Sequence, residues 1–564
     1  MATSLPQGSL QQGTVQQGRR RWWALIAIAV SVLVVGLDMT VLNLALPTLS
    51  RDLHASTGDL QWFGSAYTLV VAAVLLPVGL TGDRFGRKKI LLIALTVFGA
   101  GSAACAYAGS SGQLIAARAF LGLGAAAILP LSLSVLPVFF TEKERPKAIA
   151  IIMGAVFLGY PVGPLLGGFL LDSFWWGSVF LINVPVVVIA LAVVAALLPE
   201  SRSARRPRLD LVGMLISSAG LTALTYGFIK EGQKGWGDAA AVATIAAGAV
   251  GLAAFAGWER YTAGRATGQP LVDLRLFRSA GFTWGTLLTT LVSFALFGIL
   301  WGMPQYFQDV RGTDALGSGL RLLPMIGGLI VGMLAGTRMQ SPPRRRRARA
   351  GAAAAADGTV DDRAPGVPVS AKTLVAAGFA VMAAGLAVGA FTGSGSGAGF
   401  TAAWFAVAGA GLGLAMPSAM NAALAALSAE SSGAGSALIT AMRQVGATIG
   451  VAVLGTVINS AYRSHLAVSG LPAVVAGAAR QSIGVGIEVA GKLGSPQLLD
   501  AVRTAYVHGL DLMLWVCAGI AVACALLALA FLPRSSGSGQ SLETPPGGTP
   551  APEAEWDRGA DVRG

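Results

Sequence analysis

The sequence has few charged residues and few of the side chains that soluble enzymes use for chemistry. Only 12% of its 564 residues are charged, and it holds three cysteines and three histidines. The cysteines Cys105, Cys517 and Cys524 all lie in apolar runs, so no disulfide framework is expected. The histidines His54, His465 and His508 are far apart in sequence, which argues against a metal site.

The sequence also lacks a phosphate-binding G-x-x-x-x-G-K-S/T loop, so ATP is not the expected energy source and no cofactor is expected. The formal net charge of +13, from 40 basic and 27 acidic residues, raises the question of nucleic-acid binding. The basic residues are concentrated in short segments between apolar runs, however, and not on a soluble domain. We therefore expect no nucleic-acid partner.

Long apolar runs make up most of the chain. Hydrophobic residues account for 54% of it and the mean hydropathy is +0.67, which fits an all-α polytopic membrane protein and no soluble class. We expect fourteen transmembrane helices. Their approximate ranges are 22–46, 61–80, 89–108, 113–138, 147–171, 177–198, 210–229, 239–258, 281–307, 317–337, 373–391, 399–427, 433–459 and 509–532.

The basic clusters predict how the chain is oriented. If the N-terminus is cytoplasmic, the clusters at 84–89, 143–147, 202–208 and 344–349 all fall on the cytoplasmic side. We therefore expect an inner or plasma membrane protein with both termini in the cytoplasm. Arginine outnumbers lysine, and alanine and glycine are abundant, which indicates a GC-rich bacterial source.

An acidic residue, Asp38, lies inside the first apolar run, where an ionisable side chain costs several kcal/mol unless it faces protein or water. Asp38 lies about 24 Å above the inner edge of the membrane, and Arg118 of the fourth span lies about 8 Å below the outer edge. In a core of about 30 Å these heights nearly coincide, so the two side chains can pair. The pair is either a structural link or a proton site whose protonation depends on conformation.

Two glycine-rich segments stand out. The segment GLTGDRFGRKK after the second span combines glycines with paired charge, at Gly79, Asp83, Arg84, Gly86, Arg87 and Lys88. The fifth span reads GYPVGPLLGGFL, and its Gly159, Gly163 and Gly167 recur every four residues beside Pro161 and Pro164. Such a stripe of small residues allows close helix packing, and the prolines favour bending. Static packing is the alternative interpretation.

These segments resemble a known family. GLTGDRFGRKK is similar to the cytoplasmic-loop motif of the major facilitator superfamily, and LDMTVLNLALP resembles the first helix of its fourteen-span drug:proton antiporters. The motif Gly159-x-x-x-Gly163-Pro164-x-x-Gly167-Gly168 resembles the one associated with antiporters, and RQVGATIGVAVLG, which begins at Arg443, matches the fourteen-span group. Two departures are Leu121, where the family commonly has glutamine, and Gly177 and Ser178, where it has Arg and Trp.

The resemblance implies two six-helix bundles with two inserted helices, and a conformational latch at Asp83 that joins the halves. The expected segments are a disordered N-terminus (1–21), a first bundle (22–198), the inserted pair (199–280), a second bundle (281–532) and a disordered tail (533–564). A basic loop at 338–370 is expected to touch anionic lipid, and an external loop at 460–508 to hold helical stretches near 473–492 and 496–508. We expect this external loop to be a surface hairpin, and a gate over the outer vestibule is the alternative interpretation.

The substrate-binding residues are expected to be aromatic, amide and methionine side chains, with Arg443 as either a ligand or a structural residue. Each aromatic side chain taken singly also fits lipid-facing packing. No acid besides Asp38 is expected in the central spans, which argues against recognition of dications by several carboxylates. The expected wall consists of Gln61, Trp62, Tyr67, Phe294, Trp301, Gln305, Tyr306, Met416, Asn421 and Arg443.

Together these features predict a monomeric, proton-driven exporter of small amphiphilic compounds, and not an enzyme. Asp38 would carry the proton and Arg118 would tune it. Two alternatives remain open at this stage. One is a proton-coupled importer or uniporter of a nutrient, and the other is a membrane sensor that binds a ligand without transporting it.

Overall fold

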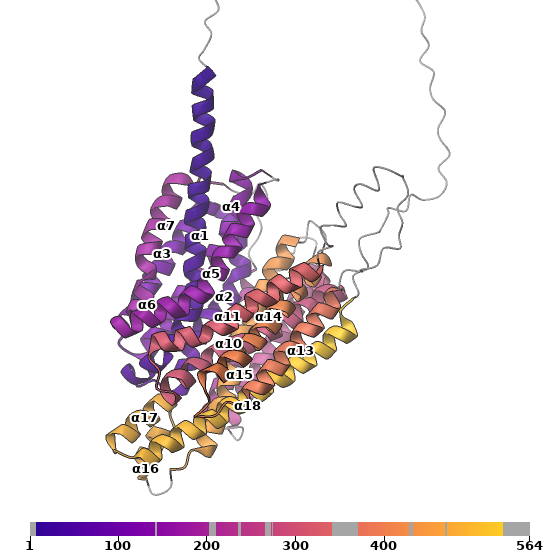
Figure 1. Cartoon of the computed structure of the whole chain (residues 1–564). Helices are drawn as coiled ribbons and strands as arrows, with labels where there is room; N and C mark the ends of the chain where they lie inside the picture. The colour runs from indigo at the N-terminus through magenta and orange to yellow at the C-terminus, as the bar shows by residue number, and fades with distance from the viewer. Residues whose placement is uncertain are drawn as a thin grey trace, which may run out of the picture.

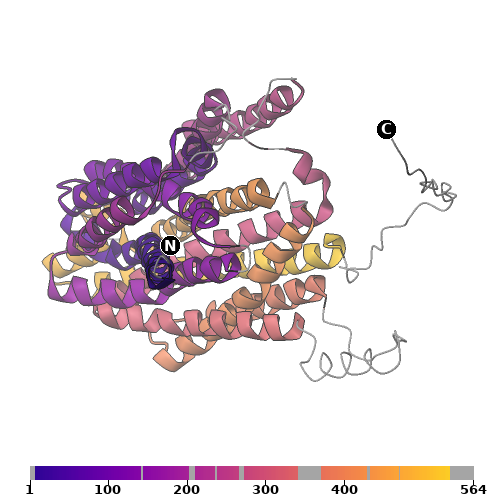
Figure 2. The same ribbon diagram turned by 90° about the horizontal axis from the view of Figure 1, so that it is seen from above.

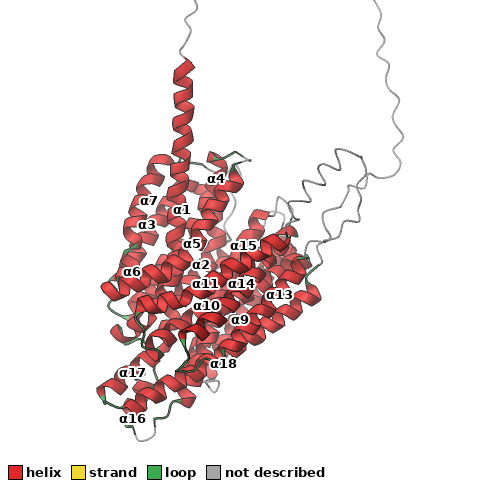
Figure 3. Cartoon of the chain, in the orientation of Figure 1, coloured by secondary structure: helices red, strands yellow, loops and turns green. Residues whose placement is uncertain are grey.

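The computed structural model describes residues 7–533, except for 142–143, 202–209, 235–237, 266–271, 273, 341–369, 428–431 and 469–470. Side chains of some helical residues, including residues 7–20, Gly79 and Asp83, also lie outside the description. The described part is helical and contains no strand (Figure 3). The basic loop and the C-terminal tail fall almost entirely outside it, so the expectations for them stay predictions.

The first half of the chain forms one bundle, in which α1 packs on α5 and α7, and α4 packs on α2 and α3. Its helices are α1 (Gln7–Asp52), α2 (Thr57–Phe85), α3 (Arg87–Ala106), α4 (Ser111–Phe139), α5 (Arg145–Ser173), α6 (Ser178–Leu181) and α7 (Asn183–Leu197). The predicted sixth span is thus divided into a short α6 and a longer α7. Helix α1 begins at Gln7, inside the segment that the sequence predicts to be disordered, because Gln and Arg are good helix formers.

The second half forms the other bundle, in which α14 packs on α10, α11 and α13, and α15 packs on α10 and α18. Its helices are α10 (Ala280–Gln305), α11 (Ala315–Gln340), α13 (Ala371–Gly389), α14 (Ala398–Ala425), α15 (Ser432–His465), α16 (Ala473–Ala479), α17 (Ile483–Lys492) and α18 (Pro496–Phe531). A π-helical turn, η2 (Tyr306–Val310), follows α10 directly. The short helices α16 and α17 and the start of α18 occupy the stretches where helix was expected in the external loop.

Between the halves, α8 (Leu211–Lys234) and α9 (Ala239–Ala263) pack on each other, and α8 also packs on α2 and α15. A 3₁₀ helix, η1 (Leu274–Arg278), leads into α10. Thirteen helices of the described chain are long and apolar enough to cross a membrane. Helix α2 is not among the thirteen, although it is 29 residues long. The expected count of fourteen spans therefore stays a prediction.

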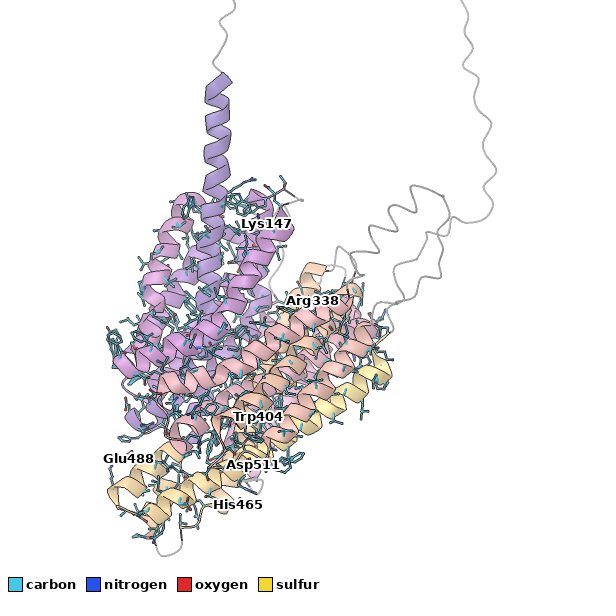
Figure 4. The ribbon with its side chains drawn as sticks, viewed as in Figure 1. Lys147, Arg338, Trp404, His465, Glu488 and Asp511 are labelled. Carbon is cyan, nitrogen blue, oxygen red and sulfur yellow. The ribbon has the colours of Figure 1, made fainter. Side chains whose placement is uncertain are left out.

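The two bundles meet at one end and diverge at the other (Figure 1). They are closest near α16 and α17, whereas the end from which α1 projects is the open one. Seen from above, α1 is viewed nearly end-on close to the middle of the molecule (Figure 2). The basic residues Lys147 and Arg338 lie at the diverging end, and Glu488 and His465 lie at the closed end (Figure 4).

Helices α1 and α5 approach each other closely through the glycine stripe. A Cβ atom added to Gly159 would lie 2.8 Å from the backbone nitrogen of Leu37, and one added to Gly167 would lie 3.2 Å from Val41. Gly163 likewise packs against Thr40. The stripe therefore fits against the stretch of α1 that carries Asp38, and close packing requires glycine there because no side chain has room.

We expect Gly159→Ala to destabilise the first bundle by about 1–3 kcal/mol, since the new methyl group overlaps the backbone of α1. The measurement is thermal unfolding of purified protein in nanodiscs. Gly154→Ala on the same helix is the matched control, because a Cβ atom there has no neighbour within 4 Å. Equal melting temperatures for the two variants would contradict the proposed close contact.

Candidate functional site

A buried ion pair joins α1 to α4. The Arg118 Nη1 donates to the Asp38 Oδ2 at 2.8 Å, and both side chains are only 2% exposed. The Arg118 Nε donates to the carbonyl oxygen of Phe63 at 3.0 Å, and the guanidinium lies 4.5 Å from the centre of the Tyr67 ring. The structure thus brings together the two residues whose heights in the membrane were expected to match.

The surroundings of this pair hold both charges in place. Two hydrogen bonds and a cation–π contact satisfy much of the Arg118 guanidinium, which compensates for the loss of water. Removing one member of a buried pair leaves an uncompensated charge, which is far more costly than losing a surface ion pair. Tyr67 was expected in the substrate wall, but its ring is buried on Arg118 and its hydroxyl has no hydrogen-bond partner in the described chain.

A separate cavity of about 230 Å³ lies between the two bundles, beside the contact of α5 with α11. From the first bundle come Thr40 of α1 and Tyr160, Pro161 and Pro164 of α5. From the second come leucine, isoleucine and methionine side chains of α10 and α11, with Met416 of α14 and Arg443 of α15. Its walls are therefore apolar, apart from a few groups that include Tyr160 and Arg443.

Only Met416 and Arg443 of the expected substrate wall line this cavity. Gln61 donates to the Ala452 carbonyl at 2.9 Å, and the Trp301 indole donates to the Leu60 carbonyl at 3.3 Å, so both bridge the closed bundles. The other expected wall residues lie elsewhere. Trp62 packs against Tyr226 of α8, Phe294 packs against α15, and Asn421 is exposed. The Gln305 amide donates to a carbonyl of its own helix, and the Tyr306 hydroxyl donates to the Gly393 carbonyl. Sequence reasoning missed Tyr160, although it lies inside the quoted fifth-span motif.

Polar contacts hold the closed end together. Asp172, at the end of α5, accepts hydrogen bonds from the backbone N–H groups of Ala315 and Leu316 at 3.0 and 2.9 Å, so it caps the start of α11 in the other bundle. Arg51 of α1 lies 3.4 Å from the buried Asp309 of η2. These contacts cross between bundles, and both must break if that end opens.

The α16–α17 segment adds a further link at this end. The Ser50 and Ser482 hydroxyls lie 3.0 Å apart, and the Thr57 N–H and hydroxyl both donate to the Gln481 carbonyl. On α17, a hydrogen bond from Lys492 lowers the pKa of Glu488, which lies 3.9 Å from His54. A segment of the second half thus lies on the first bundle.

The glycine-rich loop after α2 makes its described contacts within the first bundle. Gly86 has a positive φ of 118°, and the Lys88 Nζ donates to the Ala195 carbonyl at the end of α7 at 2.7 Å. The Arg87 N–H donates to the Ser201 carbonyl, and the Arg84 guanidinium lies over the Phe85 ring. The side chain of Asp83 and the surroundings of Gly79 lie outside the described part, so the latch between halves stays a prediction.

No acid besides Asp38 was expected in the central spans, and four further acids lie in the helices near the ends of predicted spans. Asp309 lies in η2 at the end of α10, Asp511 lies in α18, and buried Glu231 and Glu259 lie in the inserted pair. Asp511 was within the predicted last span and was overlooked. The other three follow directly after the predicted span ends, because the helices continue past the point where hydropathy falls. None of the four lines the cavity between the bundles.

A helical membrane protein of two bundles, with a buried ion pair and a cavity between the halves, is a transporter by class. The chain matches the Major Facilitator Superfamily over residues 28–359 and belongs to that family. The family resemblance inferred from the motifs is thereby confirmed, and the chain is a membrane transporter and not an enzyme.

Relatives support the same assignment. The chain is 33% identical to the multidrug efflux pump LfrA of Mycolicibacterium smegmatis, over 92% of this chain and 96% of LfrA. It is 37% identical to the tetracenomycin C resistance and export protein of Streptomyces glaucescens, over 56% of this chain and 57% of that protein.

A bacterial homologue of the human lysosomal transporter Spinster, solved in an inward-facing, unoccupied conformation, shares the fold with a TM-score of 0.61. Its identity is 16%, over 91% of this chain and 98% of that one.

We expect Arg118→Leu to destabilise the protein by about 3–5 kcal/mol, because it leaves the Asp38 carboxylate buried without its partner. Adding Asp38→Asn should recover much of this loss, since the double variant buries no unpaired charge. The measurement is a double-mutant cycle of unfolding in nanodiscs. Additive losses in the double variant would show that the two side chains are not coupled.

We expect Asp172→Ala to open the end near α16 and α17, because α11 loses its cap from α5. The control is Asp314→Ala, since Asp314 caps the same helix from within its own bundle by accepting from Gly317. Spin labels at exposed positions 107 and 391 report the distance between bundles, and the native cysteines are buried. Longer distances are expected for Asp172→Ala alone. An equal increase in distance for Asp314→Ala would show that loss of the helix cap, and not loss of the contact between bundles, opens this end.

Proposed function

We propose that the chain is a proton-coupled antiporter that exports small amphiphilic organic compounds by alternating access. The observation that carries this proposal is the buried pair of Asp38 and Arg118, with a 2.8 Å contact and 2% exposure of each side chain. A protein that only needed to hold two helices together could pack apolar residues there, which avoids the free-energy cost of burying two charges. A carboxylate in the membrane interior beside a cation is well suited to bind and release a proton.

Proton exchange follows from the strength of that contact in each conformation. While Arg118 lies on Asp38, the guanidinium favours the ionised carboxylate. If the helices shift so that the contact lengthens, the buried carboxylate favours protonation, because burial penalises an isolated charge. A proton that enters from one side is then released to the other when the contact forms again.

The direction of export depends on which end faces the cytoplasm. The end at which the bundles diverge carries Lys147 and Arg338 (Figure 4), and basic residues favour the cytoplasmic side. By this reasoning both termini are cytoplasmic, in the plasma or inner membrane, and the described conformation is open to the cytoplasm.

The proposed cargo rests on the cavity and on the relatives. Apolar walls with methionine and few fixed hydrogen bonds suit amphiphilic compounds of varied shape. LfrA is named for multidrug efflux, and the Streptomyces protein for resistance to and export of tetracenomycin C. We propose that a monomer in contact with membrane lipids suffices for transport, with the proton gradient as the energy source and no cofactor. The streptomycete and mycobacterial relatives agree with a GC-rich bacterial source.

We expect Asp38→Asn to abolish proton-driven efflux because the amide does not titrate. The variant should melt at a lower temperature but stay folded, since the amide keeps a hydrogen-bond acceptor for Arg118. The measurement is drug movement in proteoliposomes under an imposed pH gradient, with the melting temperature as the check on folding. Reversing the pH gradient distinguishes an antiporter from an importer. An antiporter moves the drug against the direction of proton flow, whereas a proton-coupled importer moves it in the same direction as the protons. Full transport by the folded variant would refute the role of Asp38.

A further inference from the structure

The cavity between the bundles contains an arginine that no carboxylate of the described residues neutralises. Arg443 of α15 lines it, and its Nε donates to the Ser293 hydroxyl at 3.4 Å. The other polar group in contact with it is the Tyr160 hydroxyl of α5, across the gap between bundles. Among the described residues no Asp or Glu forms an ion pair with Arg443, which contrasts with the close Asp38 partner of Arg118.

A guanidinium in such surroundings is incompletely compensated. Two neutral hydroxyls stabilise a cation far less than a carboxylate does, and the apolar walls supply nothing further. An anion that enters the cavity would pair with Arg443 beside largely apolar walls, where the attraction is stronger than in bulk water. A cation would meet repulsion from the same side chain.

The acids of the protein do not alter this balance. Asp38 is buried 2.8 Å from Arg118 and does not line the cavity. Thr40, two residues further along α1, does line it, and two residues correspond to a rotation of about 200° around a helix. The Asp38–Arg118 ion pair and the cavity therefore lie on opposite faces of α1. Asp309 is at the closed end, next to Arg51, and likewise does not line the cavity.

We propose that this cavity selects amphiphiles with a negative charge, such as an aromatic or aliphatic body that carries a carboxylate, sulfonate or acidic phenol. Arg443 binds the anionic group, Tyr160 donates a further hydrogen bond, and the methionine and leucine side chains of α10 and α11 cover the apolar body. The inference rests on the proposed function, because it names the class of compound that the exporter takes.

The test uses two fluorescent probes that share a pyrene body and carry head groups of opposite charge, pyrenebutyrate and pyrenebutyl-trimethylammonium. Binding of each to the full chain in nanodiscs is titrated, with empty nanodiscs as the blank for partition into lipid. The wild-type protein should prefer the carboxylate. Arg443→Gln should weaken carboxylate binding by roughly ten- to a hundredfold and change trimethylammonium binding little or improve it. Arg443→Lys should keep the preference, because it keeps the charge.

Arg321→Gln is the matched control, since Arg321 lies against Phe307 outside the cavity lining and its loss should not change the preference. Melting temperatures show that each variant is folded. Equal or stronger wild-type binding of trimethylammonium, or a charge preference that Arg443→Gln leaves unchanged, would overturn the proposal.

Transport of both probes in proteoliposomes separates this inference from the proposed function. If the protein binds the anion in preference through Arg443 but a pH gradient moves neither probe, the proposed export function is refuted and the proposed selection of anions is supported. If the gradient drives the cation in preference to the anion, export stands and the selection of anions is overturned. If it drives the anion in preference, and Arg443→Gln removes that preference, both are supported.

Discussion

The contact between Asp38 and Arg118 is the constraint on which the rest of the structure depends. Both side chains are only 2% exposed, so each charge is tolerable in the membrane because the other is 2.8 Å away. The contact fixes α1 against α4, and the carbonyl of Phe63 draws α2 into the same arrangement. Any rearrangement that lengthens it must change the protonation state or supply new partners. A transporter can use this requirement to link a chemical event to a change of shape.

Under the proposed function, the proton site and the cargo site would share a helix without sharing residues. Asp38 and Thr40 lie on opposite faces of α1, so one face holds the ion pair and the other lines the cavity. The glycine stripe of α5 packs on this same stretch of α1, and Pro164 of that helix lines the cavity. A small shift of α1 therefore displaces α5 as well, because the glycines of α5 pack directly on the backbone of α1 and on its Thr40 and Val41 side chains.

The sequence predicted the features that spacing and depth determine. The Asp38–Arg118 contact followed from two heights in a bilayer, and the close approach of α5 followed from glycines repeated every four residues. The substrate wall was predicted less well, because polarity and aromatic character do not show which way a helix is turned. Gln61 and Trp301 carry the kind of polar or aromatic side chain that can bind a substrate, yet both donate to backbone carbonyls across the closed end. Asp309 was missed because α10 continues as η2 beyond the predicted span.

The closed end owes its reversibility to the kind of contacts that it uses. Asp172, Gln61 and Trp301 each bond to backbone groups of the opposite bundle. Thr57 donates to the Gln481 carbonyl just before α17, and the Ser50 hydroxyl lies within hydrogen-bond distance of the Ser482 hydroxyl. A hydrogen bond that water can replace contributes only about 0.5–1.5 kcal/mol net, so several of them close the end without locking it. A fully apolar seam of the same extent would resist wetting much more strongly, because its exposure to water has no compensation. Polar closure at this end and a buried charge pair within one bundle are therefore complementary. The first keeps the free-energy cost of opening low, and the second is the element to which the proposed function assigns the dependence on a proton.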